Sequence, residues 1–259
     1  MTSPLLLQVG HLARRSVVRT LRQPVNIVPS FLFPLILLAV NVGGLGAAEA
    51  LPGFPTDSYL DFALAFTFMQ GALFATTSAG TDLARDIQTG FLDRLALTPM
   101  RNAALLAGQL AGIVALALVQ ATLYLTVGLV AGVRPESGVA GLFVILLLAV
   151  LVAIAFGAVG AFLALRTGSG EAVQAMFPLL FVFLFLSSMN LPRNLIEIDW
   201  FRTVATINPV SYLIEGIRSL IISGWDAQAL ALGFGVAVVL GVLALTAASL
   251  ALRGRLARA

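Results

Sequence analysis

The feature that most constrains this chain is a series of six long apolar runs. Each is long enough for a helix that crosses the hydrocarbon of a bilayer, which takes roughly 20 residues. The expected spans are 27–46, 60–80, 103–132, 139–165, 172–189 and 227–252. A mean hydropathy of +1.02 with only 10% charged residues excludes an ordinary soluble domain, in which about a quarter of the residues are charged. The sequence predicts an all-α membrane protein with one domain over 1–259, a six-helix bundle over 27–252 and a tail over 253–259.

The segment before the first span is amphipathic. Its polar and basic side chains share one helical face: Gln8, His11, Arg15, Arg19 and Arg22. Apolar residues occupy another face, which is typical of a helix lying at the membrane surface. The sequence predicts an interfacial helix within 1–24 that ends at Pro24.

The basic residues predict the orientation of the bundle. All 15 are arginines, and most lie in the N-terminal segment, in the connections after the second and fourth spans, and in the C-terminal tail. These segments share one side of the predicted bundle. Arginine is enriched in cytoplasmic loops, so both termini are expected in the cytoplasm. The pI of about 10.2 reflects these flanking arginines and does not indicate nucleic-acid binding.

Several kinds of chemistry are excluded by missing residue types. The chain has no cysteine, and its only histidine, His11, is expected on a solvated face. It has no lysine, so it lacks a phosphate-binding Walker A loop. We therefore expect no catalytic site, no metal site and no bound cofactor. An intramembrane enzyme is not supported, because no catalytic set of residues lies at membrane depth.

Uncharged polar residues, by contrast, do occur within or near the spans: Asn41, Gln70, Gln109 and Gln120. They are candidates for a substrate pathway, and hydrogen bonds between helices are the alternative explanation. No acid or arginine lies at the centre of any span. This argues against a proton- or ion-coupled transporter, which usually needs such groups.

The long connection before the last span predicts a further helix at 209–223. Asn208 and Pro209 have the sequence of an N-cap and first helical residue, and Gly224 is a natural stop. Apolar residues recur at helical spacing between them, and Glu215 and Arg218 are expected to pair on the other face. The helix is too apolar to lie in water, so we expect short half-membrane helices here. The outer-gate candidates are Asn208, Pro209, Tyr212, Glu215 and Arg218; a merely structural ion pair is the alternative.

The connection between the second and third spans, RDIQTGFLDRLALTPMR at 85–101, mixes charged and apolar residues. Thr98 and Pro99 are expected to begin the third span, which leaves a short helix at about 89–97. Phe91 and Leu95 would be exposed there. They either fold back on the membrane surface or dock a cytoplasmic partner.

Two stretches of this sequence resemble the ABC-2-type transporter permeases, especially those similar to the daunorubicin-resistance drug exporters. In the cytoplasmic connection the matching residues are Asp86, Gly90, Leu92, Asp93, Arg94, Leu95, Pro99, Met100, Leu106 and Gly108. The second stretch is Asn208-Pro209-Val210-Ser211-Tyr212, followed by Arg218. Their order and spacing extend the resemblance over essentially the whole chain.

The resemblance implies a permease subunit that is not itself an enzyme. Two permease halves, identical or different, would each dock one of two ATP-binding subunits through a coupling helix. The coupling residues would be Asp86, Thr89, Gly90, Phe91, Leu92, Asp93, Arg94 and Leu95, with Phe91 and Leu92 as anchors. ATP and Mg would be bound by the partner, and a drug, lipid or glycolipid would be exported. A carrier or scaffold that is not coupled to ATP is the alternative.

Overall fold

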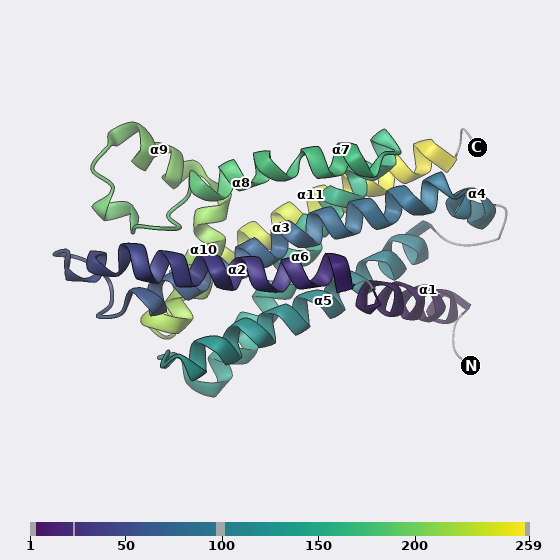
Figure 1. The fold of residues 1–259 in the computed structure, drawn as a ribbon. Helices are drawn as coiled ribbons and strands as arrows, with labels where there is room; N and C mark the ends of the chain where they lie inside the picture. The colour runs from purple at the N-terminus through teal and green to yellow at the C-terminus, as the bar shows by residue number, and fades with distance from the viewer. Residues whose placement is uncertain (1–3, 23, 97–101, 257–259) are drawn as a thin grey trace.

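The computed structural model describes residues 4–22, 24–96 and 102–256, and within these ranges its regular elements are all helices. They form an elongated bundle with both chain ends and α4 at one end, called here the terminal end (Figure 1). The α-helices are α1 Pro4–Leu21, α2 Pro24–Leu45, α3 Tyr59–Gln88, α4 Phe91–Ala96, α5 Asn102–Val130, α6 Gly138–Thr167, α7 Gly170–Ala175, α8 Phe177–Phe185, α9 Asp199–Ile207, α10 Pro209–Ile222 and α11 Ala227–Leu256; η1 Gly46–Ala50 and η2 Arg193–Leu195 are 3₁₀ turns.

Five of the helices are long and apolar enough to cross a membrane: α2, α3, α5, α6 and α11. The fifth predicted span, 172–189, is wrong as a continuous helix, because it forms α7 and α8 with a break at Met176. Pro178 is the reason, since it has no N–H for the carbonyl four residues earlier and instead lies in the first turn of α8. At the other end of the sequence, α11 extends to Leu256, into the segment predicted as a tail.

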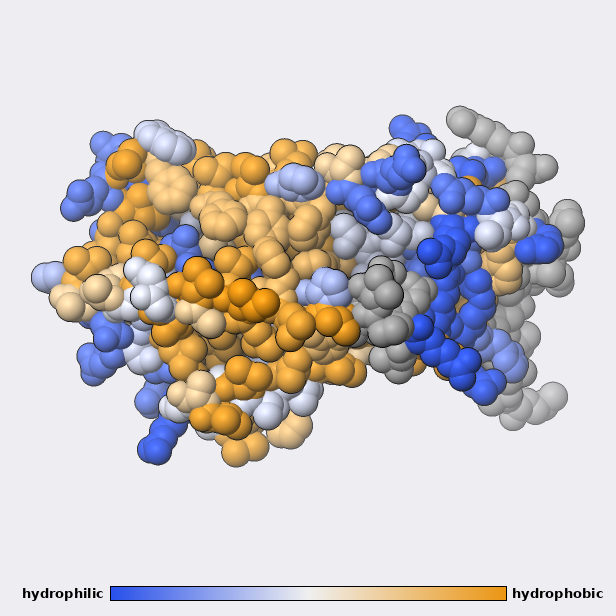
Figure 2. All heavy atoms as spheres, in the orientation of Figure 1, coloured by the Kyte–Doolittle hydropathy of each residue, from blue (hydrophilic) through white to orange (hydrophobic). Residues whose placement is uncertain are grey.

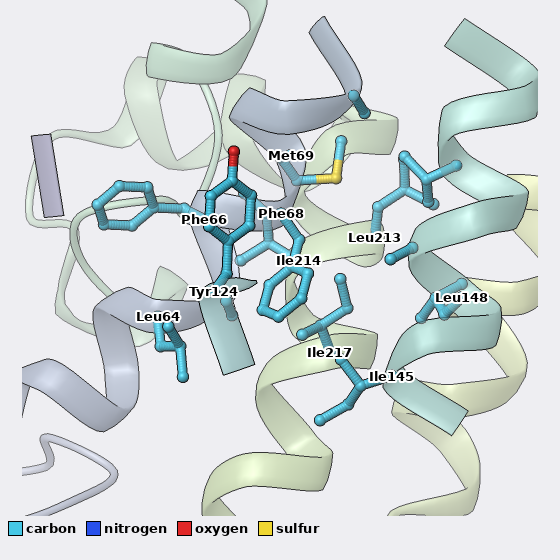
Figure 3. Packing of buried hydrophobic residues seen from close by; sticks show 14 of the residues in the cluster. Leu64, Phe66, Phe68, Met69, Tyr124, Ile145, Leu148, Leu213, Ile214 and Ile217 are labelled. Atoms are coloured by element: carbon cyan, nitrogen blue, oxygen red, sulfur yellow. The ribbon is translucent and has the colours of Figure 1, made fainter. Parts of the chain in front are cut away.

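The core of the bundle is built around α3, which is the most deeply buried of these helices. It packs against α2, α5, α6 and α10. Figure 3 shows Phe68 and Met69 of α3 among Leu148 of α6 and Ile217 of α10. The Phe68 ring meets the Tyr124 ring of α5 edge to face, with centroids 5.8 Å apart. Because neighbouring helices cover most of α3, only some of its residues can reach a functional surface.

Close helix contact depends on glycine where α3 crosses α6. A Cβ atom added to Gly160 would lie only 1.9 Å from the carbonyl oxygen of Thr76, and one added to Gly80 would lie 2.8 Å from that of Gly160. These backbones can approach because neither glycine has a side chain. The close approach of α3 and α6 therefore depends on these two glycines.

A proline also determines how α2 joins the bundle. Pro34 has no N–H to donate to the carbonyl of Ser30, one helical turn earlier. That carbonyl instead accepts hydrogen bonds from Gln120 Nε2 (3.1 Å) and the Tyr124 hydroxyl (2.8 Å) of α5. The break in the α2 hydrogen-bond ladder thus becomes a polar link between α2 and α5.

The surface has the distribution expected of a membrane protein. Apolar side chains cover the middle of the visible face, and hydrophilic side chains gather at the two ends, most densely beside α1 and α4 (Figure 2). Large apolar side chains of the spanning helices are exposed, among them Ile36 and Val40 of α2 and Val242 and Leu243 of α11. Together with the five candidate spans, this makes the chain a multi-pass membrane protein.

The orientation can be tested with single cysteines in this cysteine-free chain. Ser58 precedes α3 and Asp226 precedes α11, at the end opposite to Asn102, which begins α5. Because the arginine bias predicts cytoplasmic termini, an impermeant thiol reagent added to intact cells should label cysteines at 58 and 226 but not at 102. Labelling at 102 from outside would show that the orientation is reversed.

Candidate functional site

A buried carboxylate organises the terminal end of the bundle. Asp86, near the end of α3, is only 3% exposed. It accepts two hydrogen bonds from Arg15 (2.8 and 3.0 Å), one from Arg19 (2.8 Å) and one from Gln109 Nε2 (2.9 Å). These donors come from α1 and α5, so one side chain holds three helices together. Charge-assisted hydrogen bonds of this kind are among the stronger ones in proteins.

The charges around Asp86 balance. Arg19 also pairs with Asp82 (3.0 Å), so two arginines of α1 face two aspartates of α3, each pair four residues apart. Arg15 lies over the Phe91 ring of α4, with its guanidinium carbon 3.8 Å from the ring centroid. The hydrogen bond and charge of Asp86 raise the pKa of Arg15, although partial burial opposes this. Through Arg15 the network connects α1, α3 and α4.

This arrangement corrects two predictions made from the sequence. Arg15 and Arg19 were expected to face the membrane surface, but they face α3. Asp86 was expected to contact an ATP-binding subunit, but it is enclosed within its own chain. The matching spacing of Arg15/Arg19 and Asp82/Asp86 was the signal that could have revealed the network. Nothing local in the sequence shows that these two helix faces meet.

The short helix α4 follows a turn at Gly90, whose φ of +67° favours glycine. The helix begins at Phe91 and not at 89, because Thr89 caps the end of α3. Leu92 is only 1% exposed and packs with Leu83, Leu105 and Leu165, so its predicted role as an anchor for a partner is wrong.

The remaining residues of this stretch divide by exposure. Phe91 is partly buried and Arg94 is exposed. The side chains of Asp93 and Leu95, and residues Thr98, Pro99 and Met100, lie outside the part that the structure describes. The surface that α4 offers to another molecule is thus carried, among the described side chains, by Phe91 and Arg94.

Three of the four pathway candidates form hydrogen bonds within the bundle. Gln109 binds Asp86, Gln120 binds the Ser30 carbonyl, and Asn41 donates to the Leu37 carbonyl of its own helix (2.8 Å). Gln70 differs, because its buried amide oxygen and nitrogen have no hydrogen-bond partner, and neither does the hydroxyl of Thr67 one turn earlier. Among these four residues as the structure describes them, Gln70 is the one whose buried amide oxygen and nitrogen both lack a partner.

A groove of about 320 Å³ opens beside the same helix. Its walls combine hydroxyl, amide and aromatic side chains from α2, α3, α7 and α8: Pro29, Phe74, Thr77, Ser78, Thr81, Gln174 and Phe177. The ring centroids of Phe74 and Phe177 are 5.2 Å apart. The two rings belong to an aromatic cluster that also contains Phe33 and Phe181. The lining of the groove thus combines polar groups with aromatic rings.

At the opposite end of the bundle, α10 is set by its predicted cap. The Asn208 side chain accepts from the Val210 N–H (2.9 Å) and donates to the carbonyls of Phe183 (2.7 Å) and Leu186 (3.1 Å). Pro209 is the first helical residue and Gly224, with φ +80°, follows the last turn. The predicted helix is confirmed, and Asn208 joins it to the end of α8.

The predicted pair of Glu215 with Arg218 is wrong in this structure. Glu215 pairs with Arg193 and accepts from the Ser188 hydroxyl (2.8 Å). Arg218 is 7% exposed, lies over the Phe62 ring at 3.5 Å, and donates to the backbone carbonyls of Phe62, Ser188 and Met189 (3.0–3.1 Å). Long-range partners therefore outcompete the neighbour three residues away.

Arg193 and Tyr212 complete this second cluster. The Tyr212 hydroxyl donates to the Thr206 carbonyl (2.7 Å), and the Arg193 guanidinium lies 4.7 Å from the Tyr212 ring centroid. Partial burial works to lower the pKa of Arg193, but the hydrogen bond and charge of Glu215 outweigh it and raise the pKa. Arg193 and Ser188 thus connect three of the outer-gate candidates, Tyr212, Glu215 and Arg218, whereas Asn208 and Pro209 begin the helix.

Comparison with known proteins identifies the family. The family model described as ABC-2 type transporter matches residues 7–222. The daunorubicin resistance ABC transporter permease protein DrrB1 of Streptomyces coeruleorubidus is 30% identical over 205 residues, covering 76% of this chain and 69% of that protein. The putative transport permease ycf38 of Porphyra purpurea is 28% identical over 218 residues, and that of Pyropia yezoensis is 26% identical over 223; they cover 82% and 83% of this chain, and 72% and 74% of the two relatives.

The matched region runs from the interfacial helix α1 to the last turn of α10, and so contains both clusters described above. Family and architecture agree: the chain belongs to the ABC-2 type transporter family and is a multi-pass permease subunit.

Proposed function

We propose that this chain is the membrane-spanning half of an ATP-driven exporter in a bacterial plasma membrane. A separate subunit binds ATP and Mg, and two copies of that subunit act on a pair of permease halves. The termini and α4 face the cytoplasm. The observation that carries the proposal is α4, which is presented at the terminal end and attached to the bundle through Leu92 and Phe91.

The attachment of α4 is suited to transmitting movement. Leu92 is enclosed by side chains of α3, α5 and α6, while Phe91 contacts Arg15 of α1. A force applied to α4 therefore reaches the cytoplasmic ends of several helices through buried contacts. The exposed Arg94 and the partly exposed Phe91 would meet the ATP-binding subunit.

The groove along α3 is the proposed entry for the exported molecule. Thr77, Ser78 and Gln174 supply hydrogen-bonding groups, and Phe74 and Phe177 supply aromatic surface. This combination fits an amphipathic substrate with ring systems and hydroxyl or carbonyl groups, such as a drug, a lipid or a glycolipid. Gln70 and Thr67, which lie further along α3, can offer the next polar contacts.

The same groove supports pairing with a second permease half. Polar side chains at membrane depth normally face protein or a water-filled cavity and not lipid. The groove is open beside the exposed apolar faces of α2 and α8, where Leu32 and Val182 are about half exposed. A second half, identical or different, covering these faces would enclose the groove.

The proposed docking role of α4 is tested with Phe91→Ala. Loss of a well-packed aromatic anchor commonly costs about 2 kcal/mol of binding, roughly thirtyfold in affinity. We expect weaker co-purification with the cognate ATP-binding subunit and loss of transport-linked ATP hydrolysis in reconstituted membranes. The spanning helices should still fold, because residue 91 lies outside them.

The matched control is Phe143→Ala, an exposed phenylalanine near the start of α6 at the opposite end of the bundle. It should leave association unchanged. Wild-type association of the Phe91 variant would remove the case for docking through α4 and favour a carrier or scaffold that is not coupled to ATP.

A further inference from the structure

The connection between α8 and α9 is held down by one face of α10. We call residues 188–196 of this connection the strap. The α10 side chains that hold it lie on successive turns: Ser211, Glu215 and Arg218. The Ser188 N–H donates to the Ser211 hydroxyl (3.0 Å), and the Ser188 hydroxyl donates to Glu215 (2.8 Å). Three side chains of α10 thus attach the strap to this helix.

Two side chains of α10 with opposite charges both have partners in the strap. Glu215 pairs with Arg193, which lies in the strap. Arg218 donates to the strap carbonyls of Ser188 and Met189 (3.0 Å each), and within the described ranges it forms no ion pair. From α3, the Tyr59 hydroxyl adds one hydrogen bond to the carbonyl of Asn190 (3.1 Å).

Release of the strap would remove the partners of both charges together. Arg218 would keep only the Phe62 carbonyl and ring, and Glu215 would lose Arg193. A buried charge without a partner is strongly unfavourable. Glu215 and Arg218 are three residues apart on one helix, within reach of each other. Their mutual pairing would stabilise the released state.

We propose that Glu215 exchanges partners, binding Arg193 while the strap is closed and Arg218 when the strap is released. The strap then acts as the outer gate of the permease, a role that rests on the proposed transport function. The exchange itself does not depend on that function. It explains why α10 carries an acid and an arginine at pairing distance in sequence that do not pair in the closed structure.

A cysteine at Met189 reports release, because this side chain is 1% exposed and the chain has no other cysteine. The measurement is the rate of labelling by an impermeant maleimide on the purified full-length chain in vesicles. Glu197→Cys, at an exposed position just beyond the strap, is the control and should label rapidly in every background.

In the Met189→Cys chain, Arg193→Ala removes an attachment of the closed strap only. Glu215→Gln removes the charge that Arg193 needs but keeps an acceptor oxygen for Ser188. Partly exposed ion pairs contribute up to about 1 kcal/mol, so each change alone should raise the labelling rate up to about fivefold. Arg193→Gln is a milder version if the alanine variant does not fold.

The combination of the two changes distinguishes exchange from simple attachment. Once Arg193 is absent, the Ser188 hydroxyl is the remaining strap partner of Glu215, and glutamine keeps an acceptor for it. The charge of Glu215 then favours the released state, where it pairs with Arg218, so adding Glu215→Gln should now lower the labelling rate. This reversal of sign supports the exchange. An unchanged or higher rate in the double variant would overturn it and leave Glu215 as an anchor of the closed strap.

The gate role is tested separately with the ATP-binding subunit present. A non-hydrolysable ATP analogue should raise the labelling rate of Met189→Cys in the otherwise wild-type complex. If the reversal of sign holds without any nucleotide effect, the strap exchanges partners but is not a gate driven by ATP. If nucleotide raises the rate without the reversal, the transport function stands and the exchange fails.

Discussion

Gly160→Ala is expected to cause the largest loss of stability among single substitutions of this chain that we consider. The added Cβ would lie 1.9 Å from the Thr76 carbonyl oxygen, far inside van der Waals contact. That oxygen belongs to the backbone of α3, so it cannot rotate away as a side chain could. Overpacking commonly costs about 1–3 kcal/mol, and we expect the upper end or more because two spanning helices must separate.

The measurement for Gly160→Ala is unfolding of the purified chain by a denaturing detergent. Gly235→Ala in α11 is the matched control, since its added Cβ would meet nothing within 4 Å. It exchanges the same residue types in another spanning helix and should unfold like the wild type. Equal stability of both variants would mean that the α3–α6 crossing is looser than the structure shows.

Asp86→Ala is expected to release α1 from the bundle. The substitution removes the acceptor shared by Arg15, Arg19 and Gln109. Removing one partner of a buried ion pair typically costs about 3–5 kcal/mol. The lower end applies here, because the Arg15 side chain is 38% exposed and Arg19 keeps its pair with Asp82.

Limited trypsin digestion measures this release, since every basic cleavage site in the chain is an arginine. Cleavage after Arg15 and Arg19 should become much faster in Asp86→Ala, while α5 and α6 stay intact. The control is Glu171→Ala, an exposed acid in the first turn of α7, which should leave the cleavage pattern unchanged. Protection of α1 equal to that of the wild type would contradict the proposed role of Asp86.

Loss of α1 should also affect α4, because Arg15 links the two through the Phe91 ring. If α4 docks the ATP-binding subunit as proposed, Asp86 influences coupling from inside the permease and not by contact with the partner. The resemblance placed Asp86 in the docking surface because the residue belongs to the matching cytoplasmic stretch. Because Asp86 is buried, it supports α1 from inside the permease and does not contact the partner itself.

The sequence by itself determined the features that depend on local order. Apolar length predicted the long spanning helices, and Asn208 and Pro209 predicted the start of α10. Each of these follows from residues within one or two helical turns. The family also followed from short stretches, whose order and spacing the matched region confirmed.

Only the tertiary structure decided the partners of the polar side chains. Glu215 and Arg218 have suitable spacing to pair, yet Arg193 and three backbone carbonyls bind them instead. Asp86 is bound by arginines 67 and 71 residues away, and Leu92 faces inward. Helical periodicity shows which residues share a face but not which face of another helix it meets. In a medium without competing water, a polar group pairs with whatever donor or acceptor the packing brings to it, and that choice is made by the whole bundle.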